Sequence, residues 1–420
     1  MSTSPPKPGA PLRVLMLTDD ALQLDRRIAQ EAESLLLRGA AAGVPVGEVA
    51  FYGLSPGLAP PPRLPAGSRW IPWPLDTSTT RGIGFRDRIW RMGSRLGLAR
   101  AIEWAVYRFR DPAAGIQALH VSRPELRGFD VVIAHALPAL PLALALHERH
   151  GSRVVYDAHE VFDAQWDSLR TGAARRYWRA IGDRDMPRAH ATMTVTPQVA
   201  AALAERHRLG VAPAVVCNAC PFLGTVPPRG RLRSLYGIPA GPRLVLCQGG
   251  LLPRRGLEDL RDAGRHLDPA RVRIVFLGTG NVDYVRRLAA SVPPAVHIGR
   301  AVAQDDLLAH TTDADLGVIT DRGAGINNTL GGPNRLFEYL QARVPVLAHD
   351  HEGVRAVLAA TGTGWVEKWR SPQELAAVIE RCLEAATAVS RDALDRAARQ
   401  FSWEAQEPAL FATMRRALLA

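Results

Sequence analysis

The side chains best suited to chemistry lie in a segment toward the C-terminal end of the chain, Asn327–Ala348, which reads NNTLGGPNRLFEYLQARVPVLA. The Gly331-Gly332 pair lets a backbone approach a ligand closely, and Pro333 suits the start of a helix. A helix that begins there directs free N–H groups and a partial positive charge at an anion such as a diphosphate. Arg335 in the first turn adds a full positive charge, which is unfavourable to the helix unless an anion answers it.

Glu338 lies one turn into the same expected helix, where its carboxylate can accept hydrogen bonds from sugar hydroxyls. The plainer interpretation is an ordinary capped helix in which Glu338 only favours the helix dipole. Local physics supports the two interpretations equally, and both stay open at this point.

Arginines and a histidine follow two other apolar runs. In QGGLLPRRG, Arg254 and Arg255 can clamp phosphate oxygens, although adjacent arginines are also common in solvated turns. In VVYDAHEVF, His159 lies beside Asp157 and Glu160 and can act as an acid, a base or a hydrogen-bonding group. A structural histidine is the commoner alternative. The Gly-x-Gly of FLGTGN is a weak signal by itself.

The elements that must position these residues alternate between short apolar runs and amphipathic segments, which predicts an α/β fold of parallel sheets with helices on both faces. Strands are expected at 13–18, 44–52, 129–134, 153–156, 191–196, 214–217, 243–247, 271–277, 295–298, 316–320 and 344–348. Helices are expected at 25–38, 84–110, 140–149, 173–184, 198–208, 257–266, 282–290, 304–310, 335–343, 353–360, 371–385 and 391–420. Ligands of such sheets bind beyond the carboxyl ends of the strands, where the segments above lie.

The pattern starts twice, so we expect two Rossmann-like domains. The boundaries fall at 1–220 for the N-terminal domain, 221–241 for a linker rich in Gly, Pro and Arg, and 242–390 for the C-terminal domain, followed by a terminal helix at 391–420. Two facing units of this kind make a cleft between domains a natural ligand site.

Composition excludes several classes of protein. With 47% hydrophobic and 22% charged residues, the chain is neither wholly disordered nor collagen-like. No apolar run reaches the ~18 residues of a membrane span, and the N-terminus has no hydrophobic signal core, so a cytoplasmic protein is expected. Four cysteines are too few for a disulfide framework in 420 residues.

The net charge of +11 does not by itself indicate nucleic-acid binding. Only Lys7 and Lys368 are lysines among 52 basic residues, a usage that reflects coding bias as much as selection for phosphate, and we expect no nucleic-acid partner. A Schiff-base enzyme needs a buried lysine, and a Walker loop needs Gly-Lys-Ser/Thr, which does not occur in the sequence.

Together these segments resemble the family-4 glycosyltransferases, which have the GT-B fold. The resemblance covers nearly the whole chain in the order that the family shows, through DDALQLDRRIAQEAESLLLRG, YDAHE, VVCNACPF, GGLLPRRGLEDL, VFLGTGN, VHIGRAVAQDDL and NRLFEYLQARVPVLA. It implies two Rossmann-like domains facing across a cleft, with the acceptor on the N-terminal domain and the nucleotide-sugar donor on the C-terminal domain. It also implies that the terminal helix returns to the N-terminal domain.

The resemblance implies roles for individual residues. The expected catalytic residues are His159 near the reacting sugar, Arg255 on the donor phosphates and Glu338 on the donor ribose. Asp19 and Asp20 lie with His159 on the acceptor side. The expected donor-binding residues are Arg254, Gly299, Arg300, Val302, Gly331, Gly332, Pro333, Asn334, Arg335 and Glu338.

The chain departs from the family at two positions. Leu330 stands where the family has the first glutamate of a Glu-x7-Glu motif, and Gly250 stands where it has an arginine. Arg254 is the expected substitute for the arginine, and Asn327 or Asn328 for the contacts of the glutamate.

Metal binding is not expected. Asp183-Arg-Asp185 and Asp313-Ala-Asp315 match Asp-x-Asp, but acidic pairs of this length are common. The Cys-x-x-Cys of 217–220 has no second pair to complete a zinc site, so a packed structural role is favoured. For His349-Asp-His351, contact with an acceptor or simple solvation is favoured over a metal.

The segment 81–110 combines many arginines with aromatic residues at helical spacing. Such a basic amphipathic helix can lie on an anionic membrane, which would place the protein peripherally on the inner face of a membrane. The alternative is a helix whose aromatic face packs on its own domain.

The resulting hypothesis is a metal-independent hexosyltransferase. It would move a sugar from a UDP- or GDP-linked donor to an acceptor hydroxyl, with retention and without a cofactor, in the synthesis of a polysaccharide, a glycolipid or a secondary metabolite. The alternatives are a nucleotide-sugar epimerase, which needs no acceptor, and a catalytically silent protein that only binds nucleotide sugars.

Overall fold

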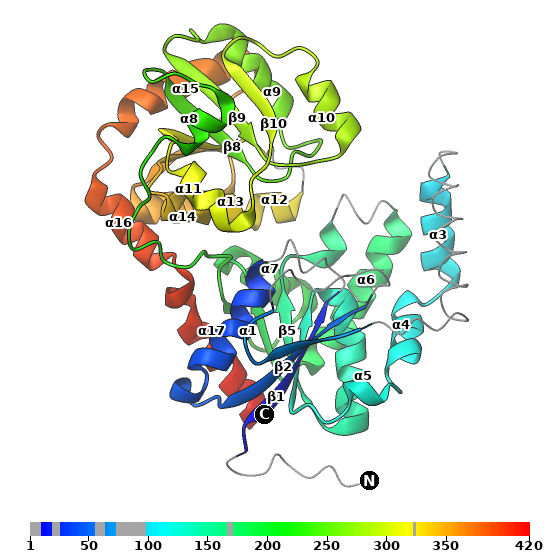
Figure 1. The fold of residues 1–420 in the computed structure, drawn as a ribbon. Helices are drawn as coiled ribbons and strands as arrows, with labels where there is room; N and C mark the ends of the chain where they lie inside the picture. Colours follow the sequence, from blue (N-terminus) through cyan, green and yellow to red (C-terminus); the bar gives the residue numbers. More distant parts are fainter. Residues whose placement is uncertain (1–9, 19–25, 55–63, 73–97, 166–170, 322–324) are drawn as a thin grey trace. The chain divides into compact units, whose positions relative to one another are not determined.

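The computed structural model describes residues 10–18, 26–54, 64–72, 98–165, 171–321 and 325–420 (Figure 1). The chain forms two compact units, Met1–Val216 with Glu407–Ala420, and Cys217–Gln406. None of the described helices is long and apolar enough to cross a lipid bilayer.

The N-terminal unit contains a seven-stranded sheet of order β3-β2-β1-β4-β5-β6-β7, in which every neighbouring pair is parallel. Its strands are β1 (Leu12–Thr18), β2 (Val46–Gly53), β3 (Ser68–Ile71), β4 (Val131–His135), β5 (Arg153–Ala158), β6 (Ala191–Thr194) and β7 (Ala214–Val215). Its described helices are α1 (Arg26–Arg38), α3 (Ala99–Phe109), α4 (Pro112–His120), α5 (Leu140–His150), α6 (Gly172–Asp185) and α7 (Pro197–His207).

The C-terminal unit contains a six-stranded parallel sheet of order β10-β9-β8-β11-β12-β13. Its strands are β8 (Arg243–Gln248), β9 (Val272–Leu277), β10 (Val296–Arg300), β11 (Leu316–Ile319), β12 (Val346–His349) and β13 (Gly364–Glu367). Its described helices are α8 (Arg231–Tyr236), α9 (Leu257–Ala263), α10 (Val282–Ala289), α11 (Leu307–Thr311), α12 (Ile326–Leu330), α13 (Asn334–Gln341), α14 (Glu352–Thr361), α15 (Pro372–Ala386) and α16 (Arg391–Gln400). The last helix, α17 (Trp403–Leu419), begins in this unit and continues into the N-terminal unit. The predicted pair of Rossmann-like parallel sheets is confirmed.

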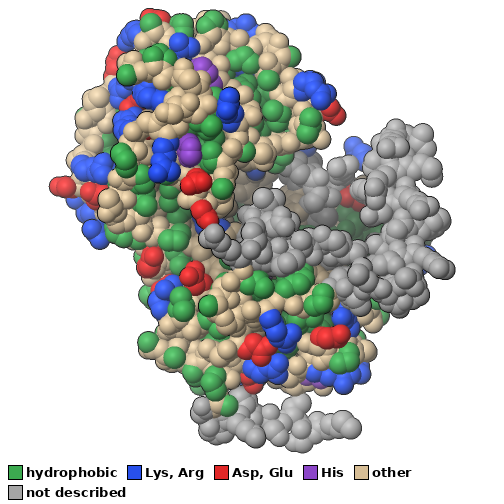
Figure 2. Space-filling model, viewed as in Figure 1, with side chains coloured by type: hydrophobic (Ala, Val, Ile, Leu, Met, Phe, Trp, Pro, Cys, Tyr) green, Lys and Arg blue, Asp and Glu red, His purple; other side chains and the backbone are tan. Residues whose placement is uncertain are grey.

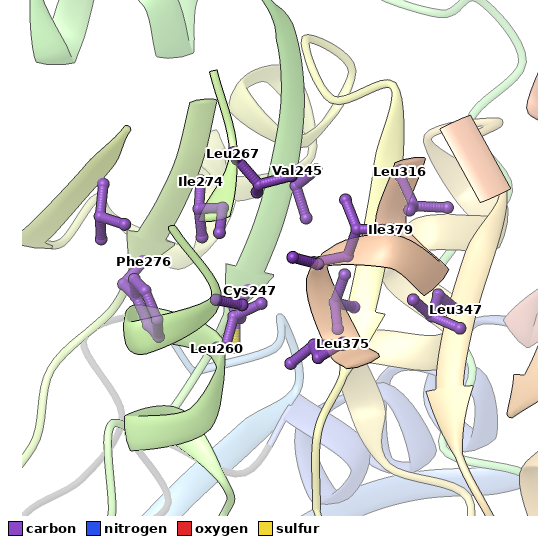
Figure 3. Close-up of a cluster of buried hydrophobic side chains, with 14 of the residues drawn as sticks. Val245, Cys247, Leu260, Leu267, Ile274, Phe276, Leu316, Leu347, Leu375 and Ile379 are labelled. Carbon is purple, nitrogen blue, oxygen red and sulfur yellow. The ribbon is translucent and has the colours of Figure 1, made fainter. Parts of the chain in front are cut away.

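Apolar strands and the helices α9, α10 and α15 form the core of the C-terminal unit. Val245, Ile274 and Leu316, from three neighbouring strands, are fully buried. Leu375 and Ile379, one helical turn apart on α15, point at these strands and are also fully buried (Figure 3). Burying each such side chain is worth about 1.5–3 kcal/mol. The packed sheet therefore gives the loops at its carboxyl edge a rigid base.

The domain boundaries differ from the expected ones. The first unit ends at Val216 instead of residue 220, and the segment expected as a linker at 221–241 belongs to the C-terminal unit. The reason is Asp313, whose carboxylate accepts hydrogen bonds from the backbone amides of Gly230, Leu232 at 2.6 Å and Arg233 at 3.0 Å. These bonds tie the start of α8 to the residues before β11.

The terminal helix at 391–420 is two helices. Helix α16 is held in the C-terminal unit, where Arg343 Nε lies 2.8 Å from Asp395 and the Gln341 amide donates to the Ala398 carbonyl. The chain enters the N-terminal unit only at Glu407, within α17.

The strands that the sequence did not predict, β3 and β13, lie at sheet edges. Both are four residues long and largely half-buried, so they carry little hydrophobic signal. The short helices α4 and α12 were missed as well. In the expected helix at 84–110, only 98–110 lies within the described residues, and α3 begins at Ala99.

Candidate functional site

The order of the C-terminal sheet reverses between β8 and β11, and ligands of doubly wound sheets bind at the carboxyl ends of such strands. The last residue of β8 is Gln248, and Thr320 and Asp321 directly follow β11. Helix α13, which comes after the short helix α12, begins at Asn334. The fold therefore brings the loop after β8, the residues after β11 and the start of α13 to one edge of the sheet.

Gln248 is the centre of a buried polar group at this edge. Its Nε2 donates to Glu338 Oε2 at 2.7 Å, and its Oε1 lies 2.8 Å from the Thr311 hydroxyl. Its backbone N–H donates to the Tyr339 hydroxyl at 3.2 Å, which in turn donates to the Leu246 carbonyl. The bond from Gln248 Nε2 holds the carboxylate of Glu338, which is 5% exposed, while the other bonds hold Gln248. A carboxylate held in this way can accept hydrogen bonds from a ligand without being reorganised.

Arg335 supplies the buried positive charge of the site. It lies in the first turn of α13, is 8% exposed and pairs through Nη2 with Asp321 Oδ2. Asp321 Oδ1 lies 3.5 Å from Arg255 Nε. Burial and the nearby Arg255 guanidinium lower the pKa of Arg335 from its ordinary value. The positive charge of Arg335 is thus balanced by the carboxylate of Asp321, which belongs to the same unit.

The loop after β8 is tied to the end of β11. The Thr320 hydroxyl donates to the Arg255 carbonyl at 2.6 Å. Gly256 has a φ of +67°, and a Cβ there would lie 2.6 Å from the Thr320 carbonyl oxygen, so only glycine fits. Arg255 is half-buried and its Nη1 donates to the Gly250 carbonyl, whereas Arg254 is exposed, with a φ of +68°.

The loop expected to hold the base lies at the end of β10. Gly299, with a φ of +100°, forms a bulge where the register with β9 shifts between Ile298 and Arg300. The Arg300 N–H donates to the Tyr236 hydroxyl at 3.2 Å. The side chains of Arg300 and Val302 are exposed and half-buried, respectively.

The residues before α13 pack on α14. A Cβ at Gly353 would lie 2.4 Å from the Leu330 carbonyl and 2.5 Å from the Gly331 carbonyl. Gly332 is buried, Pro333 is half-buried and Asn334 is exposed. His351 is 2% exposed, and its ring contacts the backbone carbonyls of Asn328 and Asp321. The expectation of a solvated or acceptor-binding histidine at this position is therefore wrong, because His351 connects two stretches of this loop.

His159, in the N-terminal unit, is held by a buried aspartate. Asp157, at the carboxyl end of β5, lies 2.9 Å from His159 Nε2 and 3.1 Å from His135 Nδ1. Arg27 donates to both Asp157 oxygens at 2.8 Å. Burial alone would raise the pKa of Asp157, but the Arg27 guanidinium and the two imidazoles hold it well below its ordinary range.

Glu31 belongs to the same buried group. It lies on α1, where its Oε1 is 3.0 Å from Arg27 Nε, and it is fully buried. Burial and the neighbouring Asp157 carboxylate raise the pKa of Glu31 well above its ordinary value. The surroundings thus shift the pKa values of the two carboxyl groups in opposite directions.

The aspartates that match Asp-x-Asp form ion pairs and hydrogen bonds with other residues of the chain. Asp183 pairs with Arg179 and His207, Asp185 pairs with Arg184 and Arg188, and Asp313 and Asp315 bind α8 and Arg229.

Within the described parts of the chain, ligand atoms of His135, Asp157 and His159 lie within 4.8 Å of one another, as at a metal site. A cation there would have to displace Arg27 from Asp157. Cys217 and Cys220 are buried free thiols, as a packed structural role predicts.

The structure adds functional candidates that were not singled out from the sequence, namely Gln248, Asp321, Arg27, Glu31 and His135. Gln248 and Asp321 had a usable signal, since each is a polar residue at the carboxyl end of an apolar strand. The N-terminal group had none, because Arg27 and Asp157 are 130 residues apart. Asp19 and Asp20 lie outside the described residues.

Taken alone, the C-terminal edge offers two guanidiniums, helix amides and a preorganised carboxylate. The guanidiniums and amides suit a diphosphate, and Glu338 suits hydroxyl groups. The N-terminal group offers an oriented imidazole. Neither set includes a cofactor-specific motif among the described residues.

Part of the chain is similar in sequence to known glycosyltransferases. Residues 242–385 match the model of the family described as glycosyl transferases group 1. A GDP-mannose-dependent alpha-(1-6)-phosphatidylinositol monomannoside mannosyltransferase of Mycobacterium tuberculosis is 31% identical over 186 residues, which cover 42% of this chain. The match spans about half of that relative, 48% of its length.

Solved structures are similar over the whole chain. Anabaena HepE in complex with UDP has a TM-score of 0.61 at 13% identity, covering 97% of this chain and 100% of that one. Sucrose-phosphate synthase from Thermosynechococcus elongatus has a TM-score of 0.64 at 14% identity, covering 96% and 98%. At these identities the structures establish the fold. The predicted resemblance to the family-4 glycosyltransferases and the predicted GT-B fold are confirmed.

Proposed function

We propose that the chain, a family-4-like protein of the GT-B fold, is a glycosyltransferase that moves a hexosyl group from a nucleoside diphosphate sugar to an acceptor hydroxyl. The observation that carries the proposal is the meeting of Arg255, Arg335 and the immobilised Glu338 at the switch point of the C-terminal sheet. All three lie inside residues 242–385, which match the group 1 transferases.

Each of these residues has a part in the proposed reaction. As the bond between sugar and diphosphate breaks, negative charge develops on the leaving group. Arg255, Arg335 and the N–H groups at the start of α13 stabilise that charge. Glu338 accepts hydrogen bonds from the ribose. No step needs a metal ion, and we propose that transfer is metal-independent and retains the anomeric configuration.

The proposed donors are UDP- and GDP-linked sugars. The mycobacterial relative is named as GDP-mannose-dependent, and HepE is described in complexes with UDP and UDP-glucose. The proposed products are a polysaccharide, a glycolipid or a glycosylated secondary metabolite. His159 is the proposed hydrogen-bonding group of the acceptor side, since Asp157 fixes its ring.

Thermal stabilisation by nucleotides tests the donor site. A ligand that binds only the folded protein raises Tm by mass action. We expect UDP or GDP to raise Tm, and Arg255→Ala to abolish the shift. The matched control is Arg265→Ala, which should keep the shift in Tm. Arg265 is an exposed arginine just after α9 that pairs with Asp262. If no nucleoside diphosphate raises Tm, the assignment of the donor site is wrong.

Acceptor dependence separates the proposal from its alternatives. With the bound donor in the presence of EDTA, a transferase releases nucleoside diphosphate faster when an acceptor is added. An epimerase converts the donor without any acceptor, and a silent binding protein releases nothing.

A second proposal concerns the lipid surface. On α3, Arg100, Trp104 and Arg108 lie at four-residue intervals and are exposed, with Trp104 47% exposed. The adjacent face of α3 is used internally, because Glu103 is buried and the Tyr107 hydroxyl accepts from Trp178 of α6. The outer face is thus basic with an aromatic centre, which suits an anionic membrane. The rest of the segment at 81–97 lies outside the described residues.

A further inference from the structure

Asp321 is an acidic side chain at the site proposed for the donor phosphates. Its Oδ2 pairs with Arg335 Nη2, and its Oδ1 lies 3.5 Å from Arg255 Nε. Asp321 is 7% exposed and Arg335 is 8% exposed. Charges that are removed from water in this way interact more strongly than they do at a surface. The carboxylate therefore has a large effect on any anion that approaches the two arginines.

The two guanidiniums carry two positive charges, and Asp321 offsets one of them. A diphosphate at this site carries two or more negative charges, so it must share the arginines with Asp321 and is repelled by it. Sharing is possible, because Arg335 Nε is buried without a hydrogen-bond partner among the described residues. That N–H remains for a second anion while Nη2 stays paired with Asp321.

The carboxylate also has a structural benefit. Arg335 lies in the first turn of α13, where a positive charge opposes the helix dipole. Asp321 neutralises this charge and lessens the repulsion between Arg335 and Arg255. The same side chain thus stabilises the folded site and competes with its ligand.

We propose that Asp321 is an internal counter-ion that weakens the binding of the nucleoside diphosphate and thereby speeds its release as product. This inference rests on the proposed function, since the competing anion is the diphosphate of the donor. The residues of the proposed donor site bind the diphosphate, and Asp321 would set how tightly they bind it.

Calorimetric titration of the full chain with UDP and with GDP tests the proposal. In Asp321→Asn we expect Kd for the diphosphate that binds the wild type to fall about tenfold, because one repulsive charge is removed. The affinity for the parent nucleoside, uridine or guanosine, should stay within about twofold, because it carries no phosphate charge. Asp321→Glu keeps the charge and should stay close to the wild type.

Asp262→Asn is the matched control. Asp262 also lies between two arginines, 2.8 Å from Arg261 and 3.4 Å from Arg265, but in the last turn of α9 and away from the carboxyl edge of the sheet. It changes the net charge of the protein by the same amount and should leave Kd within about twofold of the wild type. Thermal unfolding checks that each variant is folded, and Asp321→Ser serves as a second neutral variant if Asp321→Asn does not fold.

The outcomes separate this inference from the proposed function. If the wild type binds a diphosphate and the neutral variants bind it equally well or more weakly, Asp321 supports the arginines and the counter-ion role is overturned. If neither the wild type nor the neutral variants bind any diphosphate, the donor site is wrong, and the inference falls with it. The proposal is supported if the neutral variants bind the diphosphate more tightly than the wild type does and if a higher salt concentration reduces this difference.

Discussion

A group of buried charged residues lies in the N-terminal unit. Asp157 accepts hydrogen bonds from Arg27 and contacts two imidazoles, and it is fully buried. Charge buried in this way is tolerated only when it is paired and hydrogen-bonded. A consequence is that the ring of His159 is set by residues of α1, β4 and β5 and not only by its own loop.

The carboxyl of Glu31 gives this group a pH dependence. Its pKa is raised in the folded protein, so the unfolded chain releases this proton at lower pH than the folded one. The stability that protonated Glu31 contributes is complete below its unfolded pKa of about 4.3 and is lost as the pH rises through the folded pKa.

We therefore predict that Glu31→Gln, which resembles the protonated acid and does not titrate, gains in Tm relative to the wild type as the pH rises from about 5 to about 8. Thermal unfolding across this range measures the difference. Glu33→Gln, on the exposed face of the same helix, is the matched control for removing a carboxyl group from α1. A constant difference for both variants would mean that Glu31 is ionised throughout.

At the scale of elements, one acidic residue decides where a segment belongs. The composition of 221–241 is typical of a linker, yet Asp313 accepts three backbone N–H groups at the start of α8. Those N–H groups have no partner within a helix, and Asp313 supplies it. The segment is thereby part of the C-terminal unit.

Replacing this cap should loosen α8. Because Asp313→Ala leaves buried donors without an acceptor, we expect a loss of stability of about 1–3 kcal/mol. Urea unfolding of the full chain measures the change. Asp305→Ala, an exposed acid of the same unit, should change the stability by less than about 0.5 kcal/mol. Equal effects of the two variants would show that the Asp313 bonds contribute nothing net.

At the scale of the whole molecule, the sequence carries a net charge of +11. On the face shown in Figure 2, the described basic side chains are spread out and several lie beside acidic ones. Arg13 and Arg69, for example, both pair with Glu48. Such pairing offsets positive charge locally, while the net positive charge still attracts the protein to anionic surfaces over longer distances.

Vesicle sedimentation tests whether the exposed face of α3 binds an anionic lipid surface. We predict binding to vesicles rich in phosphatidylglycerol and none to pure phosphatidylcholine. Phe109 on α3 is 70% exposed, and Phe109→Ser should lower the bound fraction about fivefold through lost apolar burial. Val282→Ser on α10, where Val282 is 69% exposed, is the matched control and should bind as the wild type does. Binding that does not depend on lipid charge or on Phe109 would remove the proposed membrane contact.

The sequence by itself determined the class of fold and much of the candidate donor site. Buried parallel strands are continuous apolar runs, and the loops after them are short, so strand ends and the residues just beyond them could be located from the pattern alone. Arg255, Arg335 and Glu338 were found for this reason, since each is local to a predicted strand end or helix start. The edge strands β3 and β13 were not, because they are short and only partly buried.

Only the tertiary structure decided which residues these groups are bonded to. The pairing of Asp321 with Arg335, of Gln248 with Glu338 and of Asp157 with Arg27 joins residues 14, 90 and 130 positions apart. Hydrogen bonds between distant segments leave no periodicity in the sequence, because they depend on strand order and on the packing of helices onto the sheet. The same reason explains why Asp313, which matches a metal motif in the sequence, is a helix cap in the fold.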